Sequence, residues 1–162
     1  MGASRTAAGH SHTVCLKSDR TVVAWGDNWA GQTTVPSGLR GVTQVCAGMF
    51  HTAVLHGDGA VAAWGYNYYG QCNTPLGLVD VIEIAAGAGG NHTVALQRNG
   101  SVVAWGSNQY GQCTSPFSLG GVTQVAAGIF DVAVLKSDGK VVAWGDNVEG
   151  QTNVPSNLGG VS

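Results

Sequence analysis

A motif built around tryptophan recurs four times along the chain. It reads VVAWGDNWAGQTTVP around Trp25, VAAWGYNYYGQCNTP around Trp64, VVAWGSNQYGQCTSP around Trp105 and VVAWGDNVEGQTNVP around Trp144. Successive tryptophans lie 39, 41 and 39 residues apart, and an Ala-Gly pair also recurs once in each repeat. Four repeats of about 40 residues therefore cover nearly the whole chain, and a period of this length is typical of propellers and other repeat arrays.

The second repeat divides into strand-like stretches. Val42–Ala47 and His51–His56 are apolar and rich in β-branched residues, and the hairpin signal Gly57-Asp58-Gly59 leads to a third stretch over Ala60–Trp64. Gln71–Pro75 predicts a short or irregular outer strand, because proline is tolerated only at sheet edges. This pattern predicts an all-β fold, a β-propeller built from four blades of about 40 residues per chain.

The hairpin between the second and third stretches differs among the repeats. Asn99-Gly100 and Asp138-Gly139 occupy it in the third and fourth repeats, and both dipeptides favour a positive φ angle. The first repeat has Asp19-Arg20 at this place, which predicts a weaker turn.

The two ends of the sequence read as parts of one blade. Joining Ser162 to Arg5 gives GGVS-RTAAG, which parallels GGVTQVAAG at residues 120–128. We therefore expect residues 5–162 to form a four-blade unit whose ends meet in one blade, and residues 1–4 to be start or vector-like residues. Three arrangements agree with a sequence that is divided inside the first strand of a repeat. They are a closed four-blade monomer, an eight-blade ring completed by a second chain, and an excised or designed fragment. The eight-blade ring is favoured, because open sheet edges invite aggregation and blades shaped for a wide ring resist closing at four.

The repeat wording resembles that of the regulator of chromosome condensation family. The pattern V-x-A-W-G-D-N-x-x-G-Q-T-x-V-P is most similar to the bacterial branch that contains β-lactamase inhibitory protein II. The resemblance implies a propeller, usually of seven blades in this family, with loops on one face that contact a target protein. It specifies the fold more closely than the function, because one fold serves many partners.

Antiparallel topology predicts that two kinds of loop share one face. The Ala-Gly-x-x turn follows the first strand of each repeat and the Asn-x-x-Gly loop follows the third, so both lie at the same end of the blade. Variable residues on a constant framework are typical of binding scaffolds, and aromatic side chains commonly anchor protein interfaces. The predicted protein-binding residues are Trp29, Met49, Phe50, Tyr68, Tyr69, Tyr110, Ile129 and Phe130. The alternative is that some of them cover the propeller rim or pack against the neighbouring blade.

Other recurring residues are interpreted as structural. Each motif tryptophan precedes glycine, which favours packing between blades over ligand stacking. The asparagine three residues later, as in Asn28, is expected to bond the loop backbone. His12, His51 and His92 share one repeat position, where the fourth repeat has Asp131. We expect these histidines to bond backbone in the next blade rather than to form a metal ring, although such a ring of ligands is chemically reasonable.

Composition narrows the functional classes. The net charge is −2 and the seven Lys and Arg residues are scattered singly, so the basic cluster that grips nucleic acid is missing from the sequence. No stretch of 18 apolar residues predicts a membrane span, and the N-terminus does not read as a signal peptide, which leaves a cytosolic protein or a secreted one whose signal was removed. The four cysteines have no C-x-x-C spacing and are interpreted as small buried residues, with a disulfide scaffold as the alternative.

The sequence favours a non-catalytic protein. Its acidic residues fall mainly in turns and loops, and no nucleophile elbow, zinc-protease motif or phosphate-binding loop occurs. We expect no cofactor and no metal. The leading hypothesis is a protein-interaction scaffold, in its sharpest form an inhibitor of a β-lactamase, with a homodimer as the expected assembly. A designed or truncated self-assembling repeat protein and a carbohydrate-binding propeller are the alternatives.

Overall fold

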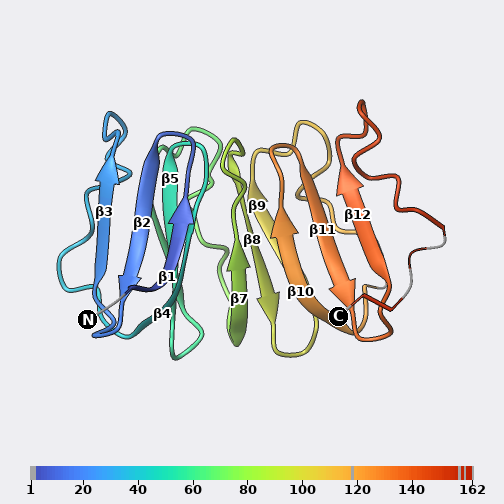
Figure 1. The fold of residues 1–162 in the computed structure, drawn as a ribbon, viewed down its shortest axis with the longest axis horizontal. Coiled ribbons are helices and arrows are strands. Elements are labelled where there is room, and N and C mark those ends of the chain that lie inside the picture. The colour runs from blue at the N-terminus through green and yellow to red at the C-terminus, as the bar shows by residue number, and fades with distance from the viewer. Residues whose placement is uncertain (1–2, 118, 157, 159, 162) are drawn as a thin grey trace.

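The computed structural model describes residues 3–117, 119–156, 158 and 160–161. Within these residues, twelve strands form four antiparallel three-stranded sheets, one for each repeat (Figure 1). We number the sheets as blades 1 to 4. Blade 1 contains β1 (Ala3–Ala8), β2 (His12–Lys17) and β3 (Val22–Gly26); blade 2 contains β4 (Val42–Ala47), β5 (His51–His56) and β6 (Val61–Gly65). Blade 3 contains β7 (Val81–Ala85), β8 (His92–Gln97) and β9 (Val102–Gly106); blade 4 contains β10 (Val122–Ala127), β11 (Asp131–Lys136) and β12 (Val141–Gly145).

The all-β propeller prediction is confirmed, and so are most strand positions. In blade 2, β4 and β5 have the predicted bounds, and β6 begins and ends one residue later than expected. Gln71–Pro75 forms a turn followed by irregular extended chain without strand pairing. The Thr74 hydroxyl in this segment donates a hydrogen bond to the Val61 carbonyl oxygen at 3.3 Å, which holds the segment beside β6. The outer part of the blade is therefore irregular and has no fourth strand.

The hairpin of each blade needs a left-handed residue. Gly59, Gly100 and Gly139 supply it with φ angles of 85°, 82° and 76°. Arg20 takes the same place in blade 1 with a φ of 65°, a conformation that a residue with a Cβ rarely adopts. The Asp19 carboxylate partly compensates, since it accepts hydrogen bonds from the Thr21 backbone N–H at 3.0 Å and the Thr21 hydroxyl at 2.6 Å. The weaker turn predicted for the first repeat is thus a turn with a strained residue.

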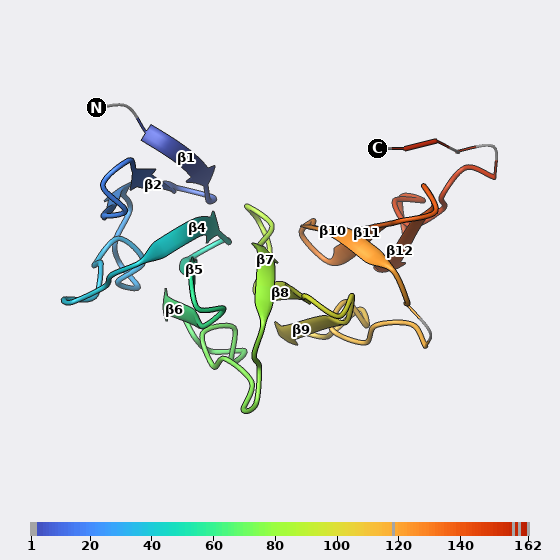
Figure 2. The same cartoon turned by 90° about the horizontal axis from the view of Figure 1, so that it is seen from below.

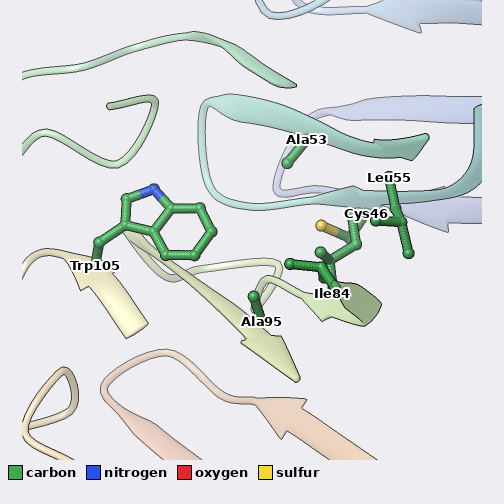
Figure 3. Packing of buried hydrophobic residues seen from close by; sticks show 7 residues of the cluster. Cys46, Ala53, Leu55, Ile84, Ala95 and Trp105 are labelled. Carbon is green, nitrogen blue, oxygen red and sulfur yellow. The ribbon is translucent and has the colours of Figure 1, made fainter. Parts of the chain in front are cut away.

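The hydrophobic cores lie between the blades. Figure 3 shows the one between blades 2 and 3, where Cys46, Ala53 and Leu55 approach Ile84, Ala95 and Trp105. Two similar clusters join blade 1 to blade 2 and blade 3 to blade 4. Each blade is a single sheet with two apolar faces, so it depends on a neighbour on both sides.

The four blades follow an open arc. Figure 2 shows β1, β4, β7 and β10 toward its inner side and a gap between blade 4 and blade 1. A closed four-blade monomer is therefore not the arrangement of the single chain. The predicted meeting of the ends joins Arg5 to Ser162, and Ser162 lies outside the described residues, so this arrangement stays a prediction. Among the residues described, no helix is long and apolar enough to cross a membrane.

Candidate protein-binding face

The two variable loop types of each repeat meet at one edge of the molecule, the upper edge in Figure 1. The register places Ala47 opposite Thr52 and His51 opposite Gly65, so the turn after β4 and the loop after β6 lie side by side. The Tyr66 N–H donates to the Phe50 carbonyl oxygen at 2.8 Å, and the other three blades make the equivalent bond. We call this edge, formed by residues 9–11, 27–31, 48–50, 66–70, 87–91, 107–111, 128–130 and 146–150, the loop face.

An asparagine closes each long loop of the loop face. The Asn67 side-chain oxygen accepts the Cys72 backbone N–H at 2.8 Å, and Asn28 accepts the Thr33 N–H at 2.9 Å. Asn108 and Asn147 make the same bond in blades 3 and 4. The prediction that these asparagines bond the loop backbone is confirmed, but the bond spans five residues instead of the two of an Asx turn.

A glutamine supports each loop from below, buried in blades 1 to 3, and sequence reasoning missed this role. The Gln32 side-chain oxygen accepts the Ala30 N–H at 3.0 Å, while its amide donates to Asp27 at 2.9 Å. Gln71 and Gln112 are equally buried and make the equivalent bond to their loops. The signal was present in the sequence, because Gly-Gln follows the loop in all four motifs. A framework held by such buried bonds positions the variable side chains firmly.

Aromatic side chains from blades 1 and 2 form one cluster on the loop face. Trp29 and Phe50 make an edge contact with ring centroids 5.5 Å apart, and Tyr66 lies 5.6 Å from Trp29. Tyr68 stacks on Tyr66 at 6.3 Å and meets Tyr69 edge-on at 5.0 Å. Trp29 and Tyr68 are the most exposed of these, at 63% and 78%. We call these five residues the aromatic cluster; four of them were predicted as binding residues.

Sequence reasoning missed Tyr66, the centre of this cluster. In the other repeats its position holds the small polar residues Asp27, Ser107 and Asp146, and the predicted binding residues did not include it. An aromatic residue that replaces a small polar one in a single repeat was the available signal. His10 also contacts the cluster, because its ring centroid lies 5.9 Å from that of Phe50.

The remaining predicted residues lie apart from the aromatic cluster. Tyr110 and Phe130 form a separate pair in blades 3 and 4, with ring centroids 4.7 Å apart. Ile129 is half exposed, at 51%, and lies over Gly89. Met49 is half-buried, and its sulfur accepts a weak hydrogen bond from the Asn91 amide at 3.8 Å. The loop face thus carries a large aromatic cluster at one end and a smaller pair at the other; the binding role of these residues stays a prediction.

Charge is divided unevenly between the two edges of the molecule. The loop face and the adjoining start of β11 carry four acidic residues, Asp27, Asp131, Asp146 and Glu149, and no Lys or Arg. Six of the seven basic residues belong to the opposite, hairpin end of the blades: Lys17, Arg20, Arg40, Arg98, Lys136 and Lys140. The loop face therefore combines exposed aromatic rings with an acidic potential, which favours a partner surface bearing basic groups.

Three of the motif tryptophans pack between blades as predicted. The indole N–H groups of Trp64, Trp105 and Trp144 donate to the carbonyl oxygens of Gln32, Gln71 and Gln112 in the preceding blade, at 3.1, 3.0 and 3.0 Å. Trp105 and Trp144 are only 7% and 8% exposed, whereas Trp25, in blade 1, is 53% exposed.

The repeated histidines form a buried row that links successive blades. His12 Nε2 lies 3.1 Å from the Thr52 hydroxyl, and His51 Nε2 lies 3.0 Å from that of Thr93. The structural role is confirmed, and a threonine hydroxyl of the next blade lies against each of these two rings. Burial lowers the pKa of His51 to about 3 and that of His92 to about 4. No group of three or more His, Cys, Asp or Glu side chains in the described part of the chain is arranged to hold a metal ion.

The cysteines carry no disulfide. Cys15 and Cys46 are buried, and Cys72 and Cys113 are half-buried and donate to loop carbonyl oxygens. Burial raises the pKa of the Cys46 thiol to about 12. Burial also raises the pKa of Cys72 and Cys113, so these three thiols are poor nucleophiles.

Comparison with known proteins agrees with the geometry. The regulator of chromosome condensation (RCC1) repeat matches residues 4–32, 42–71, 81–112 and 122–151. The chain belongs to this family. A search of curated protein sequences found no match.

Among solved structures, several regulator of chromosome condensation propellers and related folds are similar. Prp20p of Saccharomyces cerevisiae is 21% identical with a TM-score of 0.74, covering 89% of this chain and 45% of its own. Human WBSCR16 is 24% identical with a TM-score of 0.76, covering 88% and 47%. The ectodomain of the Physcomitrella patens receptor kinase CR4 is 21% identical with a TM-score of 0.74, covering 91% and 44%. The chain spans less than half the length of each, and at these identities the likeness concerns the fold alone.

Proposed function

We propose that this chain is a non-catalytic protein-binding scaffold whose partner docks on the loop face. The observation that carries the proposal is the aromatic cluster, in which Trp29 and Tyr68 stay exposed although the loops beneath them are fixed by buried glutamines. Aromatic anchors on a firm framework bind with little loss of side-chain entropy. Another protein with this fold also binds proteins, because Prp20p has binding properties to Gsp1p and histones.

The partner that we propose more specifically is a class A β-lactamase. The repeat wording resembles the bacterial branch that contains β-lactamase inhibitory protein II, whose two kinds of loop on one face contact its target. The aromatic cluster would fill an enzyme cleft, and the acidic loop residues, such as Asp146 and Glu149, would meet basic groups at its rim.

The test combines inhibition with matched alanine variants. Micromolar protein is expected to slow the turnover of a purified class A β-lactamase. The double variant Tyr68→Ala/Phe130→Ala should abolish that effect without unfolding the protein. Phe117→Ala is the control, because Phe117 is fully exposed but lies outside the loop face. Unaffected turnover with the wild-type protein removes the β-lactamase. Inhibition that survives the double variant places the binding site elsewhere.

Self-association is a second candidate function, and a separate observation favours it. The outward face of blade 1 exposes Trp25 and Val23, at 53% and 43%, although equivalent residues are covered inside the arc. Exposed apolar side chains that lie together on one sheet face are typical of an interaction surface.

Carbohydrate binding stays a prediction with less support. One sugar pocket per blade would need four similar aromatic sites, whereas the rings gather into a cluster of five and a pair. This unequal distribution favours one protein partner, and a glycan array without hits would exclude the alternative.

A further inference from the structure

The three junctions between consecutive blades are built in the same way. One blade contributes the face that bears Leu16, Leu55 or Leu96, and these leucines are 3%, 4% and 0% exposed. The next blade contributes the opposite face, which bears the motif tryptophan. We call the first of these the leucine face and the second the tryptophan face. Every internal junction is therefore a leucine face against a tryptophan face.

One face of each kind is left without a neighbour at the ends of the arc. Blade 1 presents its tryptophan face, with Trp25 and Val23 exposed. Blade 4 presents its leucine face, where Leu135 and Ala133 are only partly covered while Ala126 is exposed. A hollow of about 200 Å³ opens on that face, lined by Ala126, Ala133, Leu135 and Val141 among others. The two unmatched faces are complementary in kind.

The polar groups of the blade 4 end are already arranged for a neighbour. Gln151 accepts the Glu149 N–H at 2.9 Å and donates to Asp146 at 3.1 Å, as Gln32 does within its own loop. Gln32, Gln71 and Gln112 are fully buried under the tryptophan of the next blade, whereas Gln151 is exposed. Its carbonyl oxygen occupies the repeat position that accepts the indole N–H at every internal junction.

A second pair of polar positions agrees with the first. Inside the arc, Gln44 bonds the backbone of the next blade twice, to the Ile84 oxygen at 3.1 Å and the Ile84 N–H at 3.0 Å. Gln124 is the equivalent residue of blade 4, and it is exposed. The backbone position it needs is that of Thr6, in the exposed first strand of blade 1. Asp131 likewise stands where His12 and His51 meet the threonine of the next blade, and Thr13 is the corresponding threonine of blade 1.

We propose that a second copy of this chain closes the ring, with the leucine face of blade 4 in each copy against the tryptophan face of blade 1 in the other. The proposal rests on the self-association put forward above and assigns its surfaces. The Trp25 indole donates to the Gln151 carbonyl of the second copy, Gln124 pairs with the backbone of Thr6, and the Thr13 hydroxyl donates to Asp131. We call this contact between the two copies the seam. Two identical seams, related by a twofold axis, cover the last open sheet faces and give an eight-blade ring. Both loop faces then lie on the same side of that ring.

The first measurement is the native mass by light scattering on a sizing column. The wild-type protein is expected at twice the 16.5 kDa of one chain. Trp25→Glu and Leu135→Glu, one on each side of the seam, should each lose the doubled mass. Trp29→Ala is the matched control and should keep it, because Trp29 is an exposed tryptophan of the same blade that lies on the loop face.

Mixing the two charged variants tests the head-to-tail geometry. The Trp25→Glu chain keeps an intact blade 4 and the Leu135→Glu chain keeps an intact blade 1, so the mixture should regain a species of doubled mass through one sound seam. A contact between two equal faces predicts otherwise, since one of the variants alone would then remain dimeric.

The outcomes separate the two proposals. A wild-type mass of one chain at all concentrations overturns self-association and the seam together. A doubled mass that persists in Trp25→Glu keeps self-association and overturns the seam. Binding of a β-lactamase is measured separately through the Tyr68→Ala/Phe130→Ala variant, so its failure does not affect either result. Circular dichroism of each glutamate variant distinguishes dissociation from unfolding.

Discussion

Leu96 and Leu135 occupy the same place in two neighbouring repeats and have different surroundings. Leu96 is fully buried between blades 3 and 4, whereas Leu135 lies on the open face at the end of the arc. The same contrast separates Trp105 from Trp25. Equal sequence at equal repeat positions therefore does not mean equal contribution to stability. In a repeat array, energy resides in the junctions, and an end blade lacks one of its two junctions.

The largest change in stability should come from truncating Leu96, and truncating Leu135 provides the comparison. Leu96→Ala leaves a cavity in a packed junction and should lower the free energy of unfolding by about 2–5 kcal/mol. Leu135→Ala should cost less than about 1 kcal/mol in dilute protein, because the side chain is already partly hydrated. Urea unfolding checks both values. Equal costs in dilute protein would contradict the contrast, and a Leu135→Ala cost that grows with protein concentration would indicate that the seam forms.

The buried histidines should make stability depend on pH. The pKa of His51 is lowered to about 3 and that of His92 to about 4, both mainly by burial, against 6.5 in the unfolded chain. As pH falls below 6.5, the unfolded chain binds protons that the folded chain does not. The free energy of unfolding should therefore be constant above about pH 7.5 and fall toward pH 5, by at most about 1.4 kcal/mol per pH unit for each histidine.

One variant assigns this slope to the histidine row. His92→Asn should reduce the slope between pH 6.5 and pH 5, because it removes one of the buried groups whose pKa is lowered. The denaturation midpoints of the wild-type protein and the variant, measured between pH 6.5 and pH 5, test this assignment. A flat profile in the wild-type protein would show that these histidines titrate normally.

The sequence carried most of the fold because the local signals agree in every repeat. The strands β4 and β5 have their predicted bounds, since alternating β-branched residues and turn glycines mark them on both sides. The shared loop face also followed from antiparallel topology. Four of the five residues in the aromatic cluster were found in this way, and Tyr66, whose position holds a small polar residue in the other three repeats, was missed.

The features that could not be predicted from the sequence depend on how neighbouring blades pack against each other. The His51–Thr93 contact joins residues 42 positions apart, so it depends on how one sheet packs against the next. The openness of the arc depends on the rotation between blades, which is a property of whole junctions and of no single repeat. The burial of Gln32 has the same origin, since the tryptophan of the next blade covers it.

A smaller change in stability should follow from giving His92 a threonine partner at the junction between blades 3 and 4. Thr52 and Thr93 each donate to a glutamine carbonyl oxygen in the preceding blade, at 2.8 and 3.1 Å, and accept from a histidine. Val132 takes this place in blade 4, and His92 Nε2 has no hydrogen-bond partner in the described part of the chain. Val132→Thr should therefore raise the free energy of unfolding by about 1 kcal/mol.

The reverse change provides the matched comparison. Thr93→Val removes the partner of a buried His51 and should cost about 1–3 kcal/mol. Guanidinium unfolding of both variants at pH 7.5 measures the pair. If Val132→Thr destabilises the protein as much as Thr93→Val does, the apolar environment of blade 4 outweighs the missing hydrogen bond.

The smallest effect concerns the strained hairpin of blade 1. Arg20 has a φ of 65° where the other blades place glycine, so Arg20→Gly relieves a backbone conformation that disfavours a Cβ. The added freedom of glycine in the unfolded chain offsets part of the gain, which leaves a net stabilisation of about 0.5 kcal/mol. Gly100→Arg imposes the same strain on blade 3, an internal blade, and should lower the free energy of unfolding. Thermal unfolding compares the stability of the two variants. A lower stability of Arg20→Gly would mean that contacts of the Arg20 side chain stabilise the protein by more than the strain at Arg20 costs. The end blade would then differ from the others in its turn as well as in its missing neighbour.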